Sequence, residues 1–482
     1  PAHVVQCHRN RQRIMSTSQQ HETRIEHDSL GPVEVPANAF WGAQTQRSLE
    51  NFAIGIETFP AAFIHALGQV KRTAAEVNLQ FKLLEPARAQ AIISAAAEVA
   101  AGKLDAHFPL SIWQTGSGTQ TNMNANEVIA YRAMQLLDAH ESGQPRIHPN
   151  DEVNRSQSSN DTIPTAMHLA VVSAVHDNLL PNLRALQQSL ALHAATWQSI
   201  VKIGRTHLQD ATPLTLGQEF SAYAAQLDDA IARIARELTG LYALAQGGTA
   251  VGTGLNAPAD FGRAFAQRLA ATTGLPFEAS ANAFAGIAAH DALVGMSGAL
   301  NTAAAGLFKI AQDIRLLASG PRCGLGELRL PANEPGSSIM PGKINPTQCE
   351  ALTMICTQVM GNHATVSFAG SQGNFELNAF KPVIVYNVLQ SVRLLSDGCD
   401  SFRRLCVDGI EPDEARIAEL LQQSLMLVTA LVPHIGYDKA AKIALAAQRE
   451  GTSLREQAIA SGWVSEADFD RWVDPATMVT PR

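Results

Sequence analysis

Two long stretches in the middle of the chain carry apolar residues at every third or fourth position. The first runs from Phe220 to Leu241 and the second from Leu293 to Leu317. These steps place the apolar side chains on one face of a helix, and a seam of that length needs a partner along its whole length. The chain is therefore expected to fold as a mainly α protein around a bundle of long helices.

Other segments fit the same fold. Residues 379–395 are apolar on more than one side, as in a helix that is buried all round, which for a helix of this length predicts burial between subunits. Helical patterns also cover residues 63–81, 85–101 and, in short pieces, 436–479. The predicted divisions are a disordered extension (1–24), a mixed and helical N-terminal domain (25–156), a central helical bundle (157–412) and a small helical C-terminal domain (413–482).

Composition excludes some classes of partner. The formal net charge is −8 over 482 residues, so neither nucleic acid nor an anionic membrane is an expected partner. Apolar runs such as residues 425–432 are too short to span a bilayer. The six cysteines form no CxxC pair, which favours a reducing, intracellular compartment.

The first 14 residues bear on localisation. They contain arginines and no acid, as a transit peptide does, but they are short and lack an amphipathic pattern. Met15 reads like a natural start. The expected location is the cytoplasm, with the mitochondrion as the alternative if residues 1–14 belong to a transit peptide.

The segment from Gly336 to Pro346 is the strongest candidate for chemistry. It brings two hydroxyls, a cation and an amide together between glycine hinges, from Ser337, Ser338, Lys343 and Asn345. Such groups suit a carboxylate, which accepts both charge-assisted and neutral hydrogen bonds. On turn chemistry alone, an ordinary Gly/Pro/Ser surface loop is the alternative.

Two more segments are rich in hydroxyls and amides. Residues 115–124 resemble a phosphate cradle but lack its Gly-Lys-Ser/Thr ending. Residues 158–164 place polar caps before Pro164, which predicts a helix N-terminus whose free amides and dipole attract carboxylates. Plain capping is the alternative for the second segment.

His207, in the segment 204–210, is a candidate general acid or base near neutral pH. A lone histidine is more often structural or simply exposed. Glu350 could orient His207 and raise its basicity if the two meet in space.

Two further patterns are rejected. Gly252-Thr253-Gly254 lacks the third glycine and the strand–helix–strand context of a dinucleotide loop. The histidines form no HExxH pattern, and no cysteine–histidine cluster has zinc spacing. We therefore predict no catalytic metal.

Five segments match one superfamily in order and spacing, namely 117–124, 148–151, 158–161, 204–210 and 336–346. From about Ile25 to Val479 the chain resembles the fumarase/aspartase superfamily, and within it the class II fumarases (fumarate hydratases). Aspartases, the nearest alternative, typically carry glutamine at His207, alanine at Gly342 and Ser-Thr-Asn-Asp at residues 158–161. A third alternative is a non-catalytic structural role, as in recruited lens proteins, against which His207, Ser337 and Lys343 argue.

The resemblance implies reversible anti addition of water to fumarate, giving (S)-malate through an aci-carboxylate intermediate, as in the tricarboxylic acid cycle. Ser337 would be the base at C3 of malate. His207, oriented by Glu350, would act through a water on the departing hydroxyl. Lys343 and Asn345 would hold the carboxylate that gathers charge.

The resemblance also implies the binding residues and the assembly. The substrate would be bound by Ser117, Gly118, Thr119, Ser158, Ser159, Asn160, Thr206, Ser338, Lys343, Ile344 and Asn345. A second dicarboxylate site would comprise His148, Pro149, Asn150 and Asp151, with a structural His-Pro-Asn turn as the alternative. The implied protein has three domains, forms a homotetramer with a helical core and active sites drawn from three chains, and needs no cofactor.

Overall fold

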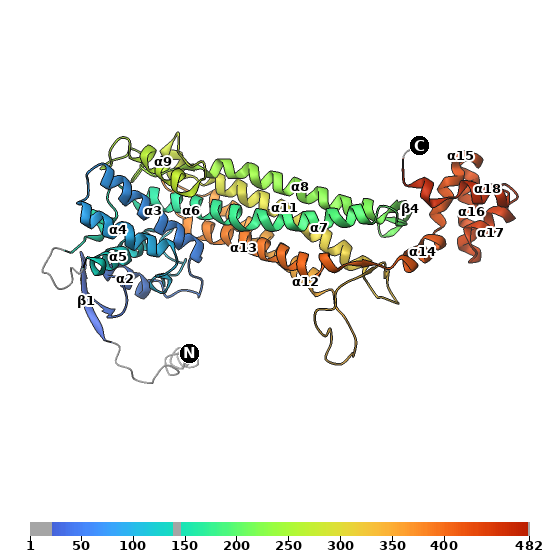
Figure 1. Ribbon diagram of the computed structural model, residues 1–482, viewed down its shortest axis with the longest axis horizontal. Coiled ribbons are helices and arrows are strands. Elements are labelled where there is room, and N and C mark those ends of the chain that lie inside the picture. The colour runs from blue at the N-terminus through green and yellow to red at the C-terminus, as the bar shows by residue number, and fades with distance from the viewer. Residues whose placement is uncertain (1–21, 138–145, 481–482) are drawn as a thin grey trace, which may run out of the picture. The chain divides into compact units, whose positions relative to one another are not determined.

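A computed structural model describes residues 22–137 and 146–480 (Figure 1). These residues form two compact units, each assembled from segments far apart in sequence. Unit 1 comprises residues 22–170, 242–290 and 372–386, and unit 2 comprises 171–241, 291–371 and 387–480. Most of the predicted N-terminal extension lies outside the described residues, and the first strand begins at Thr23. The domain boundaries expected from the sequence stay predictions.

Unit 1 contains the described elements that begin before residue 170, together with those of residues 242–290. Its elements, with the start of α6, are β1 (Thr23–Asp28), β2 (Gly31–Pro36), α2 (Ala43–Asn51), α3 (Ala61–Gln80), α4 (Pro86–Ala100), η1 (Asp105–His107), α5 (Thr119–Leu136), η2 (Pro149–Val153), α6 (Ser159–Ala174), β5 (Ala243–Leu244), α9 (Phe261–Thr273), β6 (Glu278–Ala279) and α10 (Ala283–Ala288). Helix α3 packs against α4 and α9, and α4 packs against α5. The helices predicted near residues 63–81 and 85–101 are confirmed as α3 and α4.

Unit 2 contains the long helices and the C-terminal region. Its elements, with most of α13, are η3 (Val175–Leu179), α7 (Leu180–Thr196), β3 (Val201–Thr206), β4 (Gln209–Thr215), α8 (Leu216–Leu241), α11 (Asp291–Leu317), β7 (Leu328–Arg329), α12 (Thr347–Gly370), α13 (Lys381–Leu405), η4 (Val407–Gly409), β8 (Glu411–Pro412), α14 (Glu414–Gln423), η5 (Leu425–Leu431), α15 (Val432–Ile435), α16 (Tyr437–Glu450), α17 (Leu454–Ala460), α18 (Glu466–Trp472) and η6 (Pro475–Met478).

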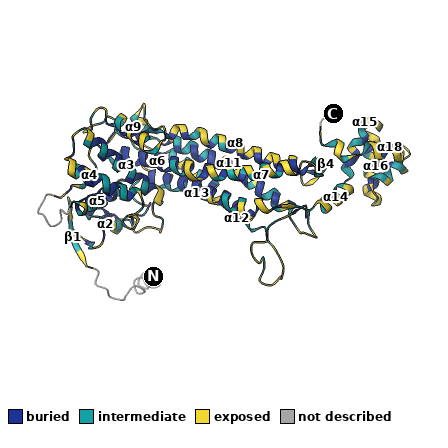
Figure 2. Cartoon of the chain, viewed as in Figure 1, coloured by how far each residue is buried: buried dark blue, intermediate teal, exposed yellow. Residues whose placement is uncertain are grey.

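The predicted bundle of long helices is confirmed. Helix α8 packs against α7 and α11, and α11 packs against α12. The seam that begins at Phe220 is buried along α8, and the seam that begins at Leu293 is buried along α11. Figure 2 shows these buried faces in dark blue on helices whose other faces are exposed. The bundle follows directly from the three- and four-residue spacing of the apolar side chains.

Helix α13 accounts for the segment that is apolar on more than one side. Ile384, Val388 and Leu395 are each 0% exposed within a single chain. Polar contacts tie this helix to its neighbours, as when Asn362 of α12 donates from Nδ2 to Ser391 Oγ at 3.0 Å. Burial inside one chain thus explains most of the apolar pattern of α13, and burial between subunits stays a prediction.

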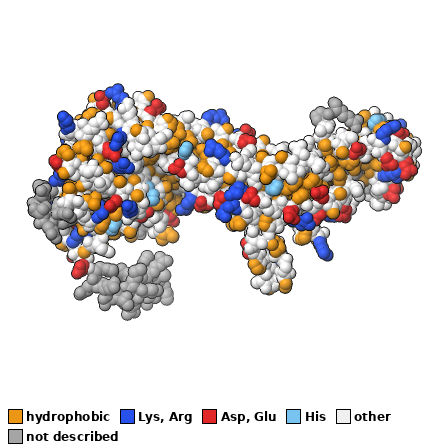
Figure 3. All heavy atoms as spheres, in the orientation of Figure 1, with side chains coloured by type: hydrophobic (Ala, Val, Ile, Leu, Met, Phe, Trp, Pro, Cys, Tyr) orange, Lys and Arg blue, Asp and Glu red, His pale blue; other side chains and the backbone are white. Residues whose placement is uncertain are grey.

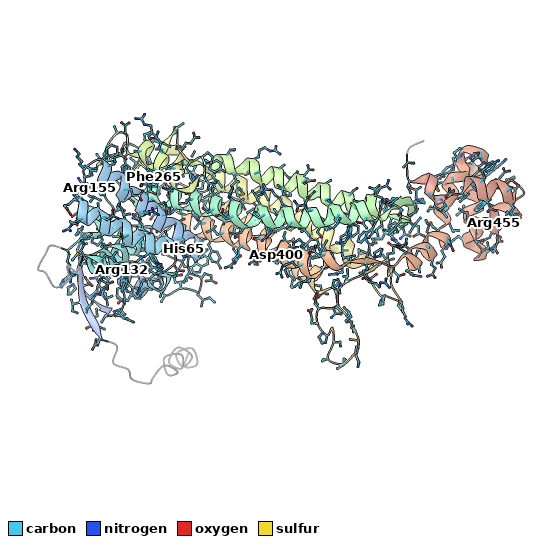
Figure 4. All side chains as sticks on the ribbon, viewed as in Figure 1. His65, Arg132, Arg155, Phe265, Asp400 and Arg455 are labelled. Atoms are coloured by element: carbon cyan, nitrogen blue, oxygen red, sulfur yellow. The ribbon has the colours of Figure 1, made fainter. Side chains whose placement is uncertain are left out.

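The last helices form a small hydrophobic core of their own. It includes Leu431, Ile443 and Ala458, which are nearly or fully buried. Helix α17 begins with a capping box between Ser453 and Glu456. Arg455, labelled in Figure 4, makes ion pairs to residues of α18 at 2.8 Å and 2.5 Å. The short helices expected after residue 436 are confirmed.

Two sequence expectations bear on environment. The described cysteines (323, 349, 356, 399 and 406) are all free, and all except Cys323 are buried. Helix α11 has the length and apolar composition of a membrane span, but half of its most apolar window is buried within the chain. A core helix of a bundle has the same properties.

Candidate active site

Ser117 and Thr119 lie where the chain turns into α5. Gly118 is the N-cap residue and has φ of +75°, a conformation that favours glycine. The Ser117 and Thr119 hydroxyls hydrogen-bond to each other at 2.8 Å, and Ser117 is only 8% exposed. Gly116 is also required, since a Cβ there would lie 1.5 Å from the carbonyl oxygen of Ala379. The close backbone approach fixes the position of the two hydroxyls.

Ser158, Ser159 and Asn160 lie at the start of α6, which confirms the predicted helix N-terminus. The backbone N–H of Asn160 donates to Ser158 Oγ at 3.2 Å, so Ser158 acts as a cap. Capping uses one lone pair of that oxygen. It therefore does not prevent Ser158 from binding a ligand as well.

Asp161 ties this segment to a second loop. Its fully buried carboxylate accepts N–H bonds from Ser158, Gly247 and Thr249, each at 2.9 Å. Asn160 Nδ2 donates to Ala250 O at 2.8 Å. The glycine pattern rejected as a dinucleotide loop, residues 252–254, thus closely follows residues that support the N-terminus of α6.

Asn122 and Lys71 connect the two hydroxyl-bearing segments. Asn122 Nδ2 donates to Ser159 Oγ and to Asn154 Oδ1, both at 3.2 Å. Lys71 Nζ donates to Asn154 Oδ1 at 2.8 Å. Burial lowers the pKa of Lys71 to about 7 and raises that of Asp161 to about 6. Unit 1 therefore brings together the predicted groups of residues 117–119 and 158–160 around a buried polar network.

The predicted second dicarboxylate site forms a tight turn. His148 Nδ1 accepts the N–H of Asp151 at 3.0 Å, so the imidazole caps the turn that follows it. A cavity of about 620 Å³ is lined by His148, Pro149 and Asn150, together with Arg24 and Arg146. The capping contact accounts for the histidine structurally, and dicarboxylate binding there stays a prediction.

In unit 2, His207 lies at the tip of the β3–β4 hairpin. Thr206 pairs with Gln209, so His207 and Leu208 form a two-residue turn. Both turn residues have positive φ, at 55° and 59°. Left-handed backbone costs a non-glycine residue about 1–2 kcal/mol. Thr206 and His207 are exposed, so the imidazole is open to a ligand.

A buried ion cluster that the sequence did not predict lies at the base of this hairpin. Glu327 is 0% exposed and pairs with Lys202 at 3.0 Å and Arg205 at 2.7 Å, both on β3. Lys202 also pairs with Glu219 of α8 at 2.7 Å. Burial does not alternate along β3, where Lys202, Ile203 and Gly204 are all buried, and no sequence signal shows that Glu327 lies opposite Lys202 and Arg205.

The loop that carries Ser337 protrudes before α12 and is held mainly by its own hydrogen bonds. Gly336 N–H donates to Lys343 O at 2.8 Å, and Asn345 Nδ2 donates to Gly336 O at 2.7 Å. Ser337 Oγ accepts the N–H groups of Ile339 and Met340 at 3.2 Å and 3.1 Å.

Most of the loop's side chains point to solvent. Lys343 and Ser338 are exposed, and Ile344 is 48% exposed. Figure 3 shows hydrophobic side chains along the loop, where Ile339 is 84% exposed. A loop of this kind is open to contact with a ligand or another chain.

Glu350 lies in the first turn of α12 and is exposed. Within the described part of the chain, no hydrogen bond or ion pair joins it to His207. Unit 2 therefore holds His207, the Ser337 loop and Glu350 as separate features, and their convergence stays a prediction.

Known proteins resemble this chain over nearly its full length. Fumarate hydratase class II from Methylorubrum extorquens is 61% identical over 95% of this chain and 98% of that protein. The protein of that name from Thermosynechococcus vestitus is 62% identical over 94% of this chain and 97% of its own length. The chain belongs to the class II fumarate hydratase family.

Family models and solved structures agree with this membership. Residues 31–361 match a lyase family, and residues 427–480 match the C-terminus of fumarase C. A class II fumarase from Schistosoma mansoni has a TM-score of 0.93 and 44% identity, covering 96% of this chain and all of that one. A fumarate lyase:delta crystallin from Brucella melitensis, bound to cobalt, has a TM-score of 0.89 and 42% identity over 95% of this chain and all of that one. The predicted fumarase/aspartase fold is confirmed.

Proposed function

We propose that this member of the class II fumarate hydratase family catalyses the reversible addition of water to fumarate, giving (S)-malate. The observation that carries the proposal is the identity of about 60% to fumarate hydratases along nearly the whole chain. His207 and Gly342, which separate the fumarase pattern from that of aspartases, support the same reaction.

In the dehydration direction, Ser337 Oγ removes a proton from C3 of malate, and the electron pair moves onto the adjacent carboxylate. Serine is a weak base unless its oxyanion is stabilised. The N–H groups of Ile339 and Met340, which already point at Oγ, favour negative charge on that oxygen. This contact supports Ser337 as the base.

The aci-carboxylate then needs positive charge and hydrogen-bond donors. Lys343 supplies the charge, and Asn345 has a second N–H beside the one donated to Gly336. The electron pair of the aci-carboxylate then forms the C2–C3 double bond as the C2–O bond breaks. His207, oriented by Glu350 and acting through a water, gives a proton to the departing hydroxyl. Acid and base on opposite faces of the substrate give anti elimination.

Ser117, Thr119 and Ser158–Asn160 bind the substrate's carboxylates, with Thr206, Gly118, Ser338 and Ile344 completing the site. The network of Asn122, Lys71 and Asp161 supports this role, because it fixes the hydroxyls before a ligand arrives. Fixed donors lose little conformational entropy when they bind.

The active protein is a homotetramer whose sites draw on three chains. Support comes from α12, where Glu350, Met354, Gly361 and Phe368 are exposed at helical spacing. Met354 and Phe368 are each 68% exposed, and large apolar side chains repeated on one face favour burial by another chain.

Mixing two inactive variants tests the shared site. His207→Asn and Ser337→Ala are unfolded and refolded together in equal amounts. If the two residues of a site come from different chains, about a quarter of the sites are intact, and a quarter of the parent activity returns. A tetrameric mixture with only the activity of the separate variants contradicts the shared site.

The reaction is proposed to need no metal, and the protein is proposed to act in the cytoplasm within the tricarboxylic acid cycle. Among the described residues, no three His, Cys, Asp or Glu side chains are placed to hold a metal ion. Activity should therefore survive EDTA. Loss of activity in EDTA that a divalent ion reverses would contradict metal independence.

A further inference from the structure

Both central residues of the β3–β4 turn have a backbone conformation that favours glycine, although neither is a glycine. His207 and Leu208 occupy both central positions with positive φ, the pattern of a type I′ turn. Glycine and asparagine are favoured there because other side chains crowd the backbone. A histidine is needed for the proposed chemistry, but a leucine in the next position is not explained by it.

Burial within its own chain does not explain Leu208 either. Its side chain is 75% exposed, so it adds little to the hydrophobic core of its own chain. A glycine would adopt the same φ without crowding. What leucine provides and glycine lacks is a Cβ, which removes most other backbone conformations from the turn.

The strands on either side hold the turn in place. Arg205 and Lys202 of β3 converge on the buried carboxylate of Glu327. The backbone of Glu327 is fixed in turn, since its N–H donates to Leu317 O and its carbonyl accepts from Asp413 N, both at 2.8 Å. Gly204 lies so close to β4 that a Cβ there would be 2.5 Å from Thr212 O.

Anchored strands leave the turn few ways to relax. The register of the hairpin shifts between Ile203 and Arg205, but beside the turn Arg205 pairs with Asp210 and Thr206 pairs with Gln209. Strain next to these fixed pairs therefore falls on the two central residues of the turn. With two non-glycine residues, the type I′ geometry is the two-residue solution that keeps the strand twist. Strain that persists in this way is often found where a side chain has to be aimed.

We propose that Leu208 is a positioning residue: its Cβ confines the turn to one conformation and so aims the imidazole of His207. The inference rests on the proposed role of His207. Leu208 makes no contact with substrate in this role. The backbone of residue 208, and not its exposed side chain, affects turnover.

Two substitutions separate the backbone from the side chain. Leu208→Gly frees the backbone, whereas Leu208→Ala keeps the Cβ and removes the exposed isobutyl group. The expected results are a kcat about tenfold lower for Leu208→Gly, with unchanged KM and no loss of thermal stability, and a parent-like kcat for Leu208→Ala. If both variants lose activity and the tetramer dissociates, Leu208 is a contact between chains, and the proposal is wrong. A parent-like Leu208→Gly also overturns it.

A double variant tests whether the effect acts through His207. In a His207→Asn background, Leu208→Gly should cause no further loss of kcat, because the group that it aims is gone. An additive loss contradicts the positioning role. A parent-like kcat for His207→Asn alone would instead contradict the proposed function of His207, so the two failures are distinguishable.

Lys82 provides a matched control. It is exposed, follows the C-cap of α3 and has φ of 59°, the same as Leu208. Lys82→Gly relieves the same kind of backbone strain in unit 1. It should leave kcat unchanged, and a tenfold fall in this variant would show that relief of strain acts on activity without His207.

Discussion

The two regions that carry the predicted site are built in opposite ways. In unit 1, the hydroxyl-bearing segments are half-buried or buried and are tied to other elements through Asn122 and Asp161. In unit 2, the loop from Gly336 to Asn345 is largely exposed, and hydrogen bonds within the loop hold it. The first region resembles a preformed carboxylate receptor, and the second resembles a segment that can move onto a bound substrate.

The contrast predicts that substitutions in the loop change chemistry and leave stability nearly intact. Ser337→Ala should lower kcat by about 10³–10⁴-fold, toward the upper end for a positioned acid or base. The melting temperature should change by less than about 2 °C, because the residue is not part of a packed core. Steady-state kinetics and calorimetry on the same preparation measure both quantities.

The control for Ser337→Ala is Glu334→Gln, which alters an exposed side chain just before the loop. It should retain parent-like kinetics. A Ser337→Ala protein with near-parent turnover would show that another group is the base.

Asp161→Asn, in the other region, should lower the stability of the fold, in contrast to substitutions in the loop. An amide cannot accept all three N–H bonds that the carboxylate accepts, and its own N–H₂ would face a backbone donor. Leaving such a buried group unsatisfied costs about 1–3 kcal/mol. The free energy of unfolding should fall by about 2 kcal/mol, and KM should rise as residues 158–160 shift.

Urea denaturation and kinetics measure the two effects of Asp161→Asn. Asp260→Asn, at an exposed position of the same unit, is the control. Equal stability of the two variants would mean that the hydrogen bonds of Asp161 do not hold residues 158–160 in place.

The buried amine of Lys71 makes the stability of unit 1 depend on pH. Its pKa is lowered from 10.5 to about 7 by burial, so between these values the unfolded chain binds the extra proton. Folding stability from this group therefore rises as the pH increases from 7 toward 10.5, and it is constant below 7. The free energy of unfolding of Lys71→Met, relative to that of the parent, should be highest near pH 7. It should fall toward pH 10, because only the parent gains stability from this group over that range.

Melting temperatures at several pH values test the Lys71 prediction. The control is Lys343→Met, since that lysine is exposed in the loop. If the melting temperatures of Lys71→Met and the parent change equally from pH 7 to pH 10, the lowered pKa of Lys71 is contradicted.

The smallest effect is expected within the loop itself. Gly342 has φ of +81° and open space where a Cβ would lie, so Gly342→Ala should cost only about 1 kcal/mol of backbone strain. Gly336→Ala should lower kcat more than Gly342→Ala does. Its Cβ would lie 2.4 Å from Lys343 O and would break the hydrogen bond that closes the loop. Equal kcat values for the two variants would show that closure of the loop by Gly336 is unimportant.

The long helices could be predicted from sequence because burial repeats with the helical period. The seams starting at Phe220 and Leu293 mark α8 and α11 nearly to their ends. The caps before Pro164 likewise marked the start of α6. Local chemistry and spacing are sufficient for such features.

Buried pairs that cross between elements could not be predicted. Lys71 lies in an ordinary helical pattern, and Glu327 lies in a glycine-rich segment 122 residues from its partner Arg205. Periodicity shows which face is buried but not which charges meet there. The strain at Leu208 is also invisible in sequence, because it depends on how the flanking strands are anchored.

One assay separates fumarate hydration from ammonia-lyase activity and from a non-catalytic role. The purified protein, without added metal, is incubated with (S)-malate and separately with L-aspartate, and fumarate is followed by its ultraviolet absorbance. We expect fumarate from malate, none from aspartate, and loss of the signal in Ser337→Ala. Fumarate from aspartate, or a folded protein that forms none from malate, would contradict the proposed hydratase activity.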